Sequence, residues 1–173
     1  MKRLLIALVG LLALASCSMA PITIDVLPML GDNASGSQSV VATGSLDFRL
    51  PDVSGQQVSG YDEIPMRPAS VSLDYELSLE QDGDLSGTAQ VTFYMAASSA
   101  DLWDSANQLG EAQQVDMSRQ QQTVSGTLAL NDAQIDALMS GEFVVGARLS
   151  GNVTGSANLS YQFERLLLKV AFF

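Results

Sequence analysis

The sequence contains no histidine. Histidine is the base of Ser-His-Asp and Cys-His catalysis, a ligand in many zinc sites and the commonest general base near neutral pH, so sites of these kinds are excluded. A Gly-x-Ser-x-Gly nucleophile motif, a P-loop and a dinucleotide-binding spacing are absent as well. For an enzyme this leaves paired carboxylates, which suffice to hydrolyse a glycosidic bond.

Acidic residues are abundant: nineteen of them against eight basic residues give the chain a net charge of −11. Pairs of acids are therefore explained most simply as parts of a solvated surface, and without a pocket they do not indicate catalysis. We interpret the protein as a non-enzyme and keep a carboxylate-dependent, glycan-active enzyme as an alternative. The pairs on which that alternative depends are Asp62/Glu63, Asp82/Asp84 and Asp101/Asp104.

Basic residues are scarce: the chain has only eight, and Lys2 and Arg3 are two of them. A surface with this excess of negative charge repels phosphate backbones, so nucleic acid is excluded as a partner. The same surface offers no basic patch to anionic lipid headgroups.

One acidic stretch, Asp82-Gly83-Asp84 after Glu80, has the oxygen donors that Ca²⁺ prefers. The 12-residue calcium loop is absent, however, and Asp-Gly is a strong signal for a two-residue hairpin turn. We therefore expect a turn here and no cofactor in the protein, with Asp82 and Asp84 as the residues to test for calcium.

Cysteine occurs once, at Cys17, so the chain has no internal disulfide. Lys2 and Arg3 precede an almost wholly apolar run, residues 4–15, which is too short for a membrane-spanning helix of about 20 residues. A basic start, a short apolar run and small residues after it are typical of a secretory signal peptide. We expect residues 1–16 to be this signal peptide.

The end of the segment is more specific, because Leu14-Ala15-Ser16-Cys17 has an aliphatic residue and two small residues before the cysteine. It resembles the lipobox of bacterial lipoproteins. The resemblance covers residues 1–17 and implies cleavage before Cys17, a diacylglycerol on its thiol and acylation of the new amino group. Ser18, where enteric-type lipoproteins retained in the inner membrane have Asp, implies an outer-membrane destination. An ordinary signal-peptidase site after Ala15 is the alternative and would leave a free thiol.

Alternating polar and apolar residues predict strands over most of the remaining chain. The clearest is 71–80, in which every odd position is apolar and every even position polar. The Asp-Gly turn and the alternating segment 88–95 complete a β-hairpin with it. Further strands are predicted at 21–26, 45–50, 123–130, 143–149 and 157–163.

One helix is predicted at 132–139, since Asn131 and Gln134 have the spacing of a capping box and Gly141 ends the apolar stripe. Residues 101–111, which carry Trp103, are either a short helical turn or a loop. The terminal run 166–173 is apolar on both faces, which fits a central strand or a buried helix.

Together these elements predict an all-β protein, an antiparallel β-sandwich of Ig-like or jelly-roll-like type with one short crossover helix near 132–139. A small outer-membrane β-barrel is the structural alternative, although 6% aromatic residues are few for two interfacial girdles. The Gly/Ser-rich stretch 31–39 favours a linker or long loop. We therefore divide the chain into the signal peptide, a lipidated cysteine with tether and first short strand (17–39) and one domain (40–173).

These expectations favour a lipid-anchored protein of the bacterial cell envelope that is a non-catalytic binding or structural module. A carrier of an apolar small ligand between the two sheets is a further alternative. The expected partners are the membrane, through the lipid on Cys17, and an envelope protein or glycan that the sequence does not identify.

Overall fold

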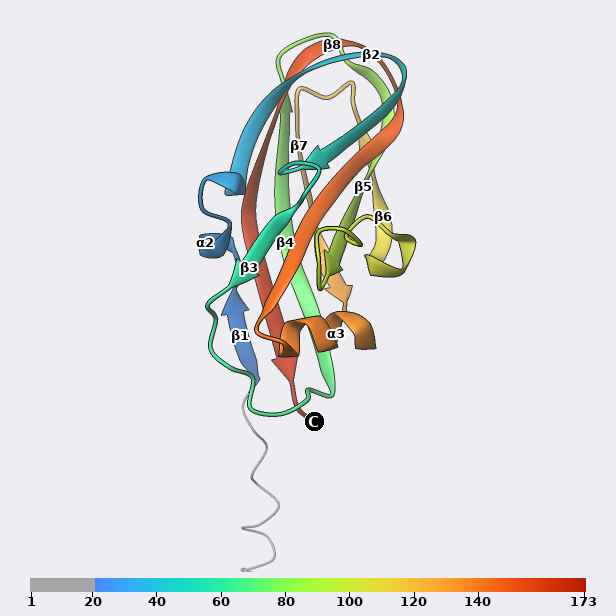
Figure 1. Ribbon diagram of the computed structural model, residues 1–173. Helices are drawn as coiled ribbons and strands as arrows, with labels where there is room; N and C mark the ends of the chain where they lie inside the picture. Colours follow the sequence, from blue (N-terminus) through green and yellow to red (C-terminus); the bar gives the residue numbers. More distant parts are fainter. Residues whose placement is uncertain (1–20) are drawn as a thin grey trace, which may run out of the picture.

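The computed structural model describes residues 21–173 (Figure 1). Antiparallel strands make up most of this part of the chain, which confirms the predicted β-sandwich. Among the described residues, no helix has the length and apolar character needed to cross a membrane. The elements in chain order are β1 (Ile22–Asp25), α2 (Leu27–Leu30), η1 (Gly31–Ala34), β2 (Ser35–Leu50), β3 (Gln56–Ser59), β4 (Ser70–Gln81), β5 (Ser86–Ala96), η2 (Ser105–Asn107), β6 (Gln108–Asp116), β7 (Gln121–Ala129), α3 (Asp132–Met139) and β8 (Glu142–Ala171).

The long strand β8 organises the sandwich. Along one edge its first half pairs with β5 and its second half with β4, while its other edge pairs in turn with β3, β2 and β1. One layer therefore has the order β6, β5, the first half of β8 and the second half of β2, and β3 pairs with the start of β8. The other layer has the order β7, β4, the second half of β8 and the first half of β2, and β1 pairs with the end of β8. In Figure 1 both β8 and β2 bend over at the top of the molecule, where they pass from one layer to the other.

Glycines permit the bend because neighbouring backbones come very close there. A Cβ at Gly151 would lie 2.3 Å from the Thr88 carbonyl oxygen. A Cβ at Gly155, whose φ of +112° already disfavours other residues, would lie 2.2 Å from the Asp84 carbonyl oxygen. Close packing of β8 against β5 and the β4–β5 turn thus needs residues without side chains.

The core lies between the two layers and follows the predicted alternation. Leu73, Tyr75 and Leu77 of β4 are buried, as are Val91 and Phe93 of β5. The rings of Tyr75 and Phe93 pack with their centroids 4.2 Å apart. The hairpin predicted at 71–80 and 88–95 is therefore confirmed, with its apolar face inward.

The predicted strands at 143–149 and 157–163 and the terminal run 166–173 belong to one continuous strand of 30 residues, β8. The terminal run is a strand and not a helix as far as Ala171, and it pairs with both β1 and β4. The mostly small and polar residues 150–156 separate the first two segments and Glu164 and Arg165 separate the last two, and the pairing of β8 continues past both. The short predicted strands were thus parts of one element.

The prediction of a linker or long loop at 31–39 is wrong. Residues 31–34 form η1, and residues 35–39 begin β2, paired with 158–162 of β8. A Cβ at Gly36 would lie 2.8 Å from Cε1 of Tyr161, so the glycine makes room for the ring on the neighbouring strand. Residues 31–39 are therefore part of the sheet and its flanking turn.

The crossover helix α3 is confirmed at 132–139. The Asn131 side chain accepts a hydrogen bond from the Gln134 amide at 3.0 Å, and the Gln134 side chain accepts one from the Asn131 amide at 2.9 Å. This capping box satisfies amide groups at the helix start. The helix connects β7 in one layer to β8 in the other and closes one end of the sandwich (Figure 1).

Alkaline pH is expected to destabilise the fold through Tyr61. Its hydroxyl donates to the Leu138 carbonyl at 2.6 Å, and burial, aided by the charge of Glu142, raises its pKa from 10.0 to about 12. Between these values the folded state keeps a proton that the unfolded state loses, so stability falls as pH rises. At about 1.36 kcal/mol for each pKa unit, the loss is at most about 2.7 kcal/mol.

Urea unfolding of residues 21–173 at pH 8 and pH 11 tests this expectation with Tyr61→Phe. At pH 8 the variant should be less stable by about 1 kcal/mol, because a carbonyl loses its donor. Between pH 8 and pH 11 it should lose less stability than the wild type. Tyr75 and Tyr161, whose pKa values burial also raises, are common to both proteins. Equal losses in the two proteins would contradict the role of Tyr61.

Candidate functional site

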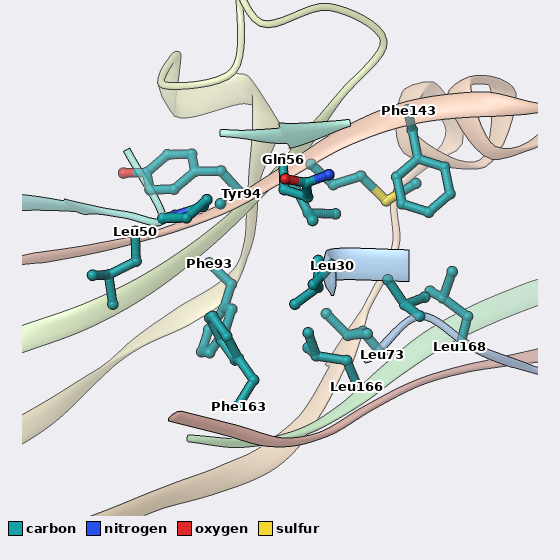
Figure 2. A pocket seen from close by; sticks show the side chains of 15 residues that line it. Leu30, Leu50, Gln56, Leu73, Phe93, Tyr94, Phe143, Phe163, Leu166 and Leu168 are labelled. Carbon is teal, nitrogen blue, oxygen red and sulfur yellow. The ribbon is translucent and has the colours of Figure 1, made fainter. Parts of the chain in front are cut away.

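A small apolar cavity lies between the layers, with a volume of about 30 Å³. Figure 2 shows Leu30 of α2 projecting between Gln56 on one side and Leu73 and Leu166 on the other. Small-molecule pockets are usually about 300–1,000 Å³. In this structure the cavity is therefore too small for the apolar ligand that the carrier alternative requires.

The lipobox residues Leu14, Ala15 and Ser16 and the cysteine Cys17 lie outside the described residues. Their assignment rests on the sequence.

Asp82 binds the β4–β5 turn to β8. One of its carboxylate oxygens accepts from the Asn158 amide at 2.8 Å, and the other accepts from the Asn158 side chain at 3.0 Å. These hydrogen bonds lower the pKa of Asp82. The Asp84 amide donates to the Ser156 carbonyl at 3.0 Å. In residues 21–173 no three side chains of the types that bind metals gather in one place, so the turn itself accounts for Asp82.

The other paired acids lie away from the cavity. Asp62 and Glu63 are on the loop between β3 and β4, and Asp101, in the loop after β5, accepts from the Ser98 hydroxyl at 2.8 Å. A glycosidase also needs a carboxylic acid whose pKa is raised. Four carboxyls have instead a pKa that hydrogen bonds lower, so none of these four meets that requirement: Asp47, Asp74, Asp82 and Asp116.

A second apolar cluster covers the outer face of the β5–β8 layer. The loop that follows β5 turns back over the sheet and buries Leu102 completely. Trp103 lies beside it, and a Cβ at Gly146 would be 2.6 Å from the indole ring. The Trp103 ring also packs edge-on against Tyr94, with centroids 5.3 Å apart. This part of the sheet is thus buried on both faces.

Trp103 is held in a fixed orientation. Its indole nitrogen donates to the Val53 carbonyl at 2.7 Å. The guanidinium carbon of Arg49 lies 5.1 Å from the centroid of the ring, which is within the range of a cation–π contact. The indole therefore links the loop after β5, the loop after β2 and strand β2.

Two arginines face each other across β2 and β8, since Arg49 is the register partner of Arg148. Like charges in this position are destabilising. Arg148 is neutralised by Asp47, to which it donates at 2.7 and 3.0 Å, and Arg49 lies over Trp103. The bidentate bond to Arg148 lowers the pKa of Asp47, which is therefore ionised near neutral pH and unable to supply a proton.

We call the group formed by Asp47, Arg49, Val53, Trp103 and Arg148 the tryptophan corner. It adjoins a surface groove of about 410 Å³, similar in size to three others of about 310–380 Å³, so the residues of the groove and not its volume distinguish it. Val53, with 69% of its surface exposed, gives the groove an apolar wall. The full lining is Gln38, Asp47, Phe48, Arg49, Pro51, Asp52 and Val53.

Sequence reasoning did not identify this corner. Asp47 and Arg49 were placed only as polar positions of a strand, and Trp103 was placed in an undefined segment. The one available signal was the single tryptophan of the chain in a polar loop, since a large amphipathic ring outside the core often marks a contact surface.

No protein-family model and no curated protein matches the chain. Among solved structures it is similar to a carbohydrate-binding module specific for non-crystalline cellulose, at 10% identity and a TM-score of 0.39, over 70% of this chain and 71% of that one. A module in complex with β-1,4-galactotriose is similar at 7% identity and a TM-score of 0.34, over 85% and 89% of the two chains.

A chain of infectious bursal disease virus, Gx strain, is similar at 14% identity and a TM-score of 0.40, over 90% of this chain and 34% of that one. This chain thus spans about a third of the viral one. Likenesses as loose as these three assign it neither a ligand nor a function.

Proposed function

We propose that the protein is a lipid-anchored module of the cell envelope that binds a neutral glycan at the tryptophan corner and does no chemistry on it. The observation that carries this proposal is the groove of about 410 Å³ beside Arg49 and Trp103, with apolar and polar groups on its walls. A sugar ring has an apolar face and a rim of hydroxyls, so it needs both kinds of group.

The polar groups of the groove are suited to hydroxyls. Gln38 has an amide that donates and accepts, the guanidinium of Arg49 donates, and the carboxylates of Asp47 and Asp52 accept. Arg49 and Asp47 are already held by Trp103 and Arg148, so binding would order few new side chains.

Charge favours a neutral ligand over an acidic one. The groove has carboxylates beside its one arginine, and the chain as a whole has a net charge of −11. A polyanion would be repelled over the whole surface. The ionised state of Asp47 supports binding without catalysis, because a general acid in this place would need a proton.

A neutral glycan is expected to bind the wild type and to bind Arg49→Ala at least about tenfold more weakly, a loss of about 1.4 kcal/mol. A glycan array with neutral and acidic oligosaccharides identifies the ligand, and calorimetry measures the affinity. Trp103→Phe should weaken binding less than Arg49→Ala, because a ring remains to pack against Gly146 and Tyr94.

Arg119→Ala is the matched control. This arginine is exposed on the β6–β7 turn, where it pairs with Asp116 at 3.6 Å. The control variant should bind as the wild type does. The proposal fails if no neutral glycan binds, or if Arg49→Ala and Arg119→Ala have the same affinity as the wild type.

The lipid anchor rests on the lipobox Leu14-Ala15-Ser16-Cys17. One acyl chain gives only marginal membrane binding, whereas two or three hold a protein stably. Cells grown with a palmitate analogue should therefore label the wild type and leave Cys17→Ala unlabelled, with Ser18→Ala labelled as a control. Equal labelling of wild type and Cys17→Ala would refute the assignment, as would a mature protein that begins at Ser16.

A further inference from the structure

Four parts of the chain meet at one end of the sandwich, which we call the anchor end: the start of β1, the loop 60–69, α3 and the last residues of β8. Ile22 is the register partner of Val170, and Ser70 is that of Ala171. The Ala69 amide donates to the Ala171 carbonyl at 2.8 Å. In Figure 1 these parts lie at the lower end of the molecule, opposite the bend of β2 and β8.

Side-chain contacts join the loop 60–69 to α3. Tyr61 donates to the Leu138 carbonyl at 2.6 Å, and Arg67 pairs with Asp132 at 2.9 Å and also with Asp136. The loop and the helix therefore form one continuous surface at the anchor end.

From this surface we infer that the anchor end lies directly on the membrane, with Met66 and Phe173 in contact with lipid. The inference rests on the proposed lipidation of Cys17. Only residues 18–21 separate that cysteine from Ile22, where β1 begins. A fully extended chain advances at most about 3.6 Å per residue, so Ile22 lies within about 18 Å of the lipid-bearing residue.

The sandwich is much longer than this connection. Half of the 30-residue strand β8 spans one layer, which at about 3.3 Å per residue is roughly 50 Å. The connection is too short to reach past the domain, so the anchor end must face the membrane. The β4–β5 turn, with Asp84, then points away from it.

The exposed apolar side chains fit this orientation. Met66 is 46% exposed on the loop 60–69, and Phe173 is 80% exposed beside the end of β8. Such side chains enter the boundary between headgroups and acyl chains favourably. The anchor end also carries Asp62, Glu63 and Glu142, in addition to the two carboxylates that pair with Arg67, so the favoured surface is a zwitterionic lipid and not an anionic one.

The tryptophan corner remains accessible in this orientation. Gly146, under the Trp103 ring, is four residues along β8 from Glu142, which corresponds to about 13 Å. Arg49 in the groove is the register partner of Arg148, six residues along β8 from Glu142 and thus about 20 Å from it, so the groove lies clear of the anchor end.

Depth-dependent quenching tests the inference on the full mature protein. Met66→Cys and, as the matched control at the opposite end, Asp84→Cys are each labelled with an environment-sensitive fluorophore. The lipidated proteins are placed in phosphatidylcholine vesicles that contain spin-labelled lipid. The label at residue 66 should be quenched several-fold more than the label at residue 84, and aqueous iodide should give the reverse order.

The outcomes separate the inference from the proposed function. Mass spectrometry first establishes whether Cys17 carries lipid, and its absence would overturn both the anchor and the orientation. A lipidated protein whose two labels are quenched equally, or more strongly at residue 84, would overturn the orientation alone.

Discussion

Removal of residues 166–173 is expected to leave the chain without a folded state. This segment of β8 lies between β1 and β4, and both would lose hydrogen-bonding partners. It also buries four large side chains: Leu166, Leu168, Val170 and Phe172. Burial of each contributes about 1.5–3 kcal/mol, against a total stability of about 5–15 kcal/mol. The loss is therefore comparable with the whole stability of the domain.

Circular dichroism and size exclusion of residues 21–165 and 21–173 check this expectation. The control is residues 21–172, which lacks only the exposed Phe173 and should fold normally. A soluble, folded protein of residues 21–165 would show that the end of β8 is dispensable.

Gly151→Val is expected to lower the free energy of unfolding by about 3 kcal/mol, at the upper end of the usual cost of overpacking. A Cβ at this position would lie 2.3 Å from the Thr88 carbonyl oxygen and 2.5 Å from the Ala89 Cα. Both are backbone atoms, so no side-chain rotation relieves the contact. Strands β5 and β8 would have to move apart at the bend. Side chains of both strands form part of the core between the layers, so that core would be disturbed as well.

The matched control is Asn152→Val, one residue along the same strand, where the side chain is exposed. Valine suits an exposed strand position, so this change should stay within about 0.5 kcal/mol of the wild type. For a domain of this size, Gly151→Val should lower the melting temperature by about 6–12 °C. Equal melting temperatures for the two variants would mean that the strands are not in close contact at Gly151.

Features that depend only on neighbouring residues could be predicted from the sequence. Alternation along 71–80 placed Leu73, Tyr75 and Leu77 inward, because successive side chains of a strand point to opposite faces. The spacing of Asn131 and Gln134 was sufficient to place the start of α3. The resemblance of residues 14–17 to a lipobox likewise depends on neighbouring residues alone, and it stays a prediction.

The pairing of the strands and the candidate site, by contrast, could not be predicted, because they depend on contacts between distant segments. Main-chain hydrogen bonds form whatever the side chains are. The Ser/Gly-rich start of β2 is therefore a strand because β8 lies beside it, and large side chains of β8 such as Tyr161 fill the space that the small residues leave. The same pairing brought Arg49 next to Arg148, and the folded loop after β5 brought Trp103 to Arg49. These contacts join segments far apart in the chain, and no local pattern of residues encodes them.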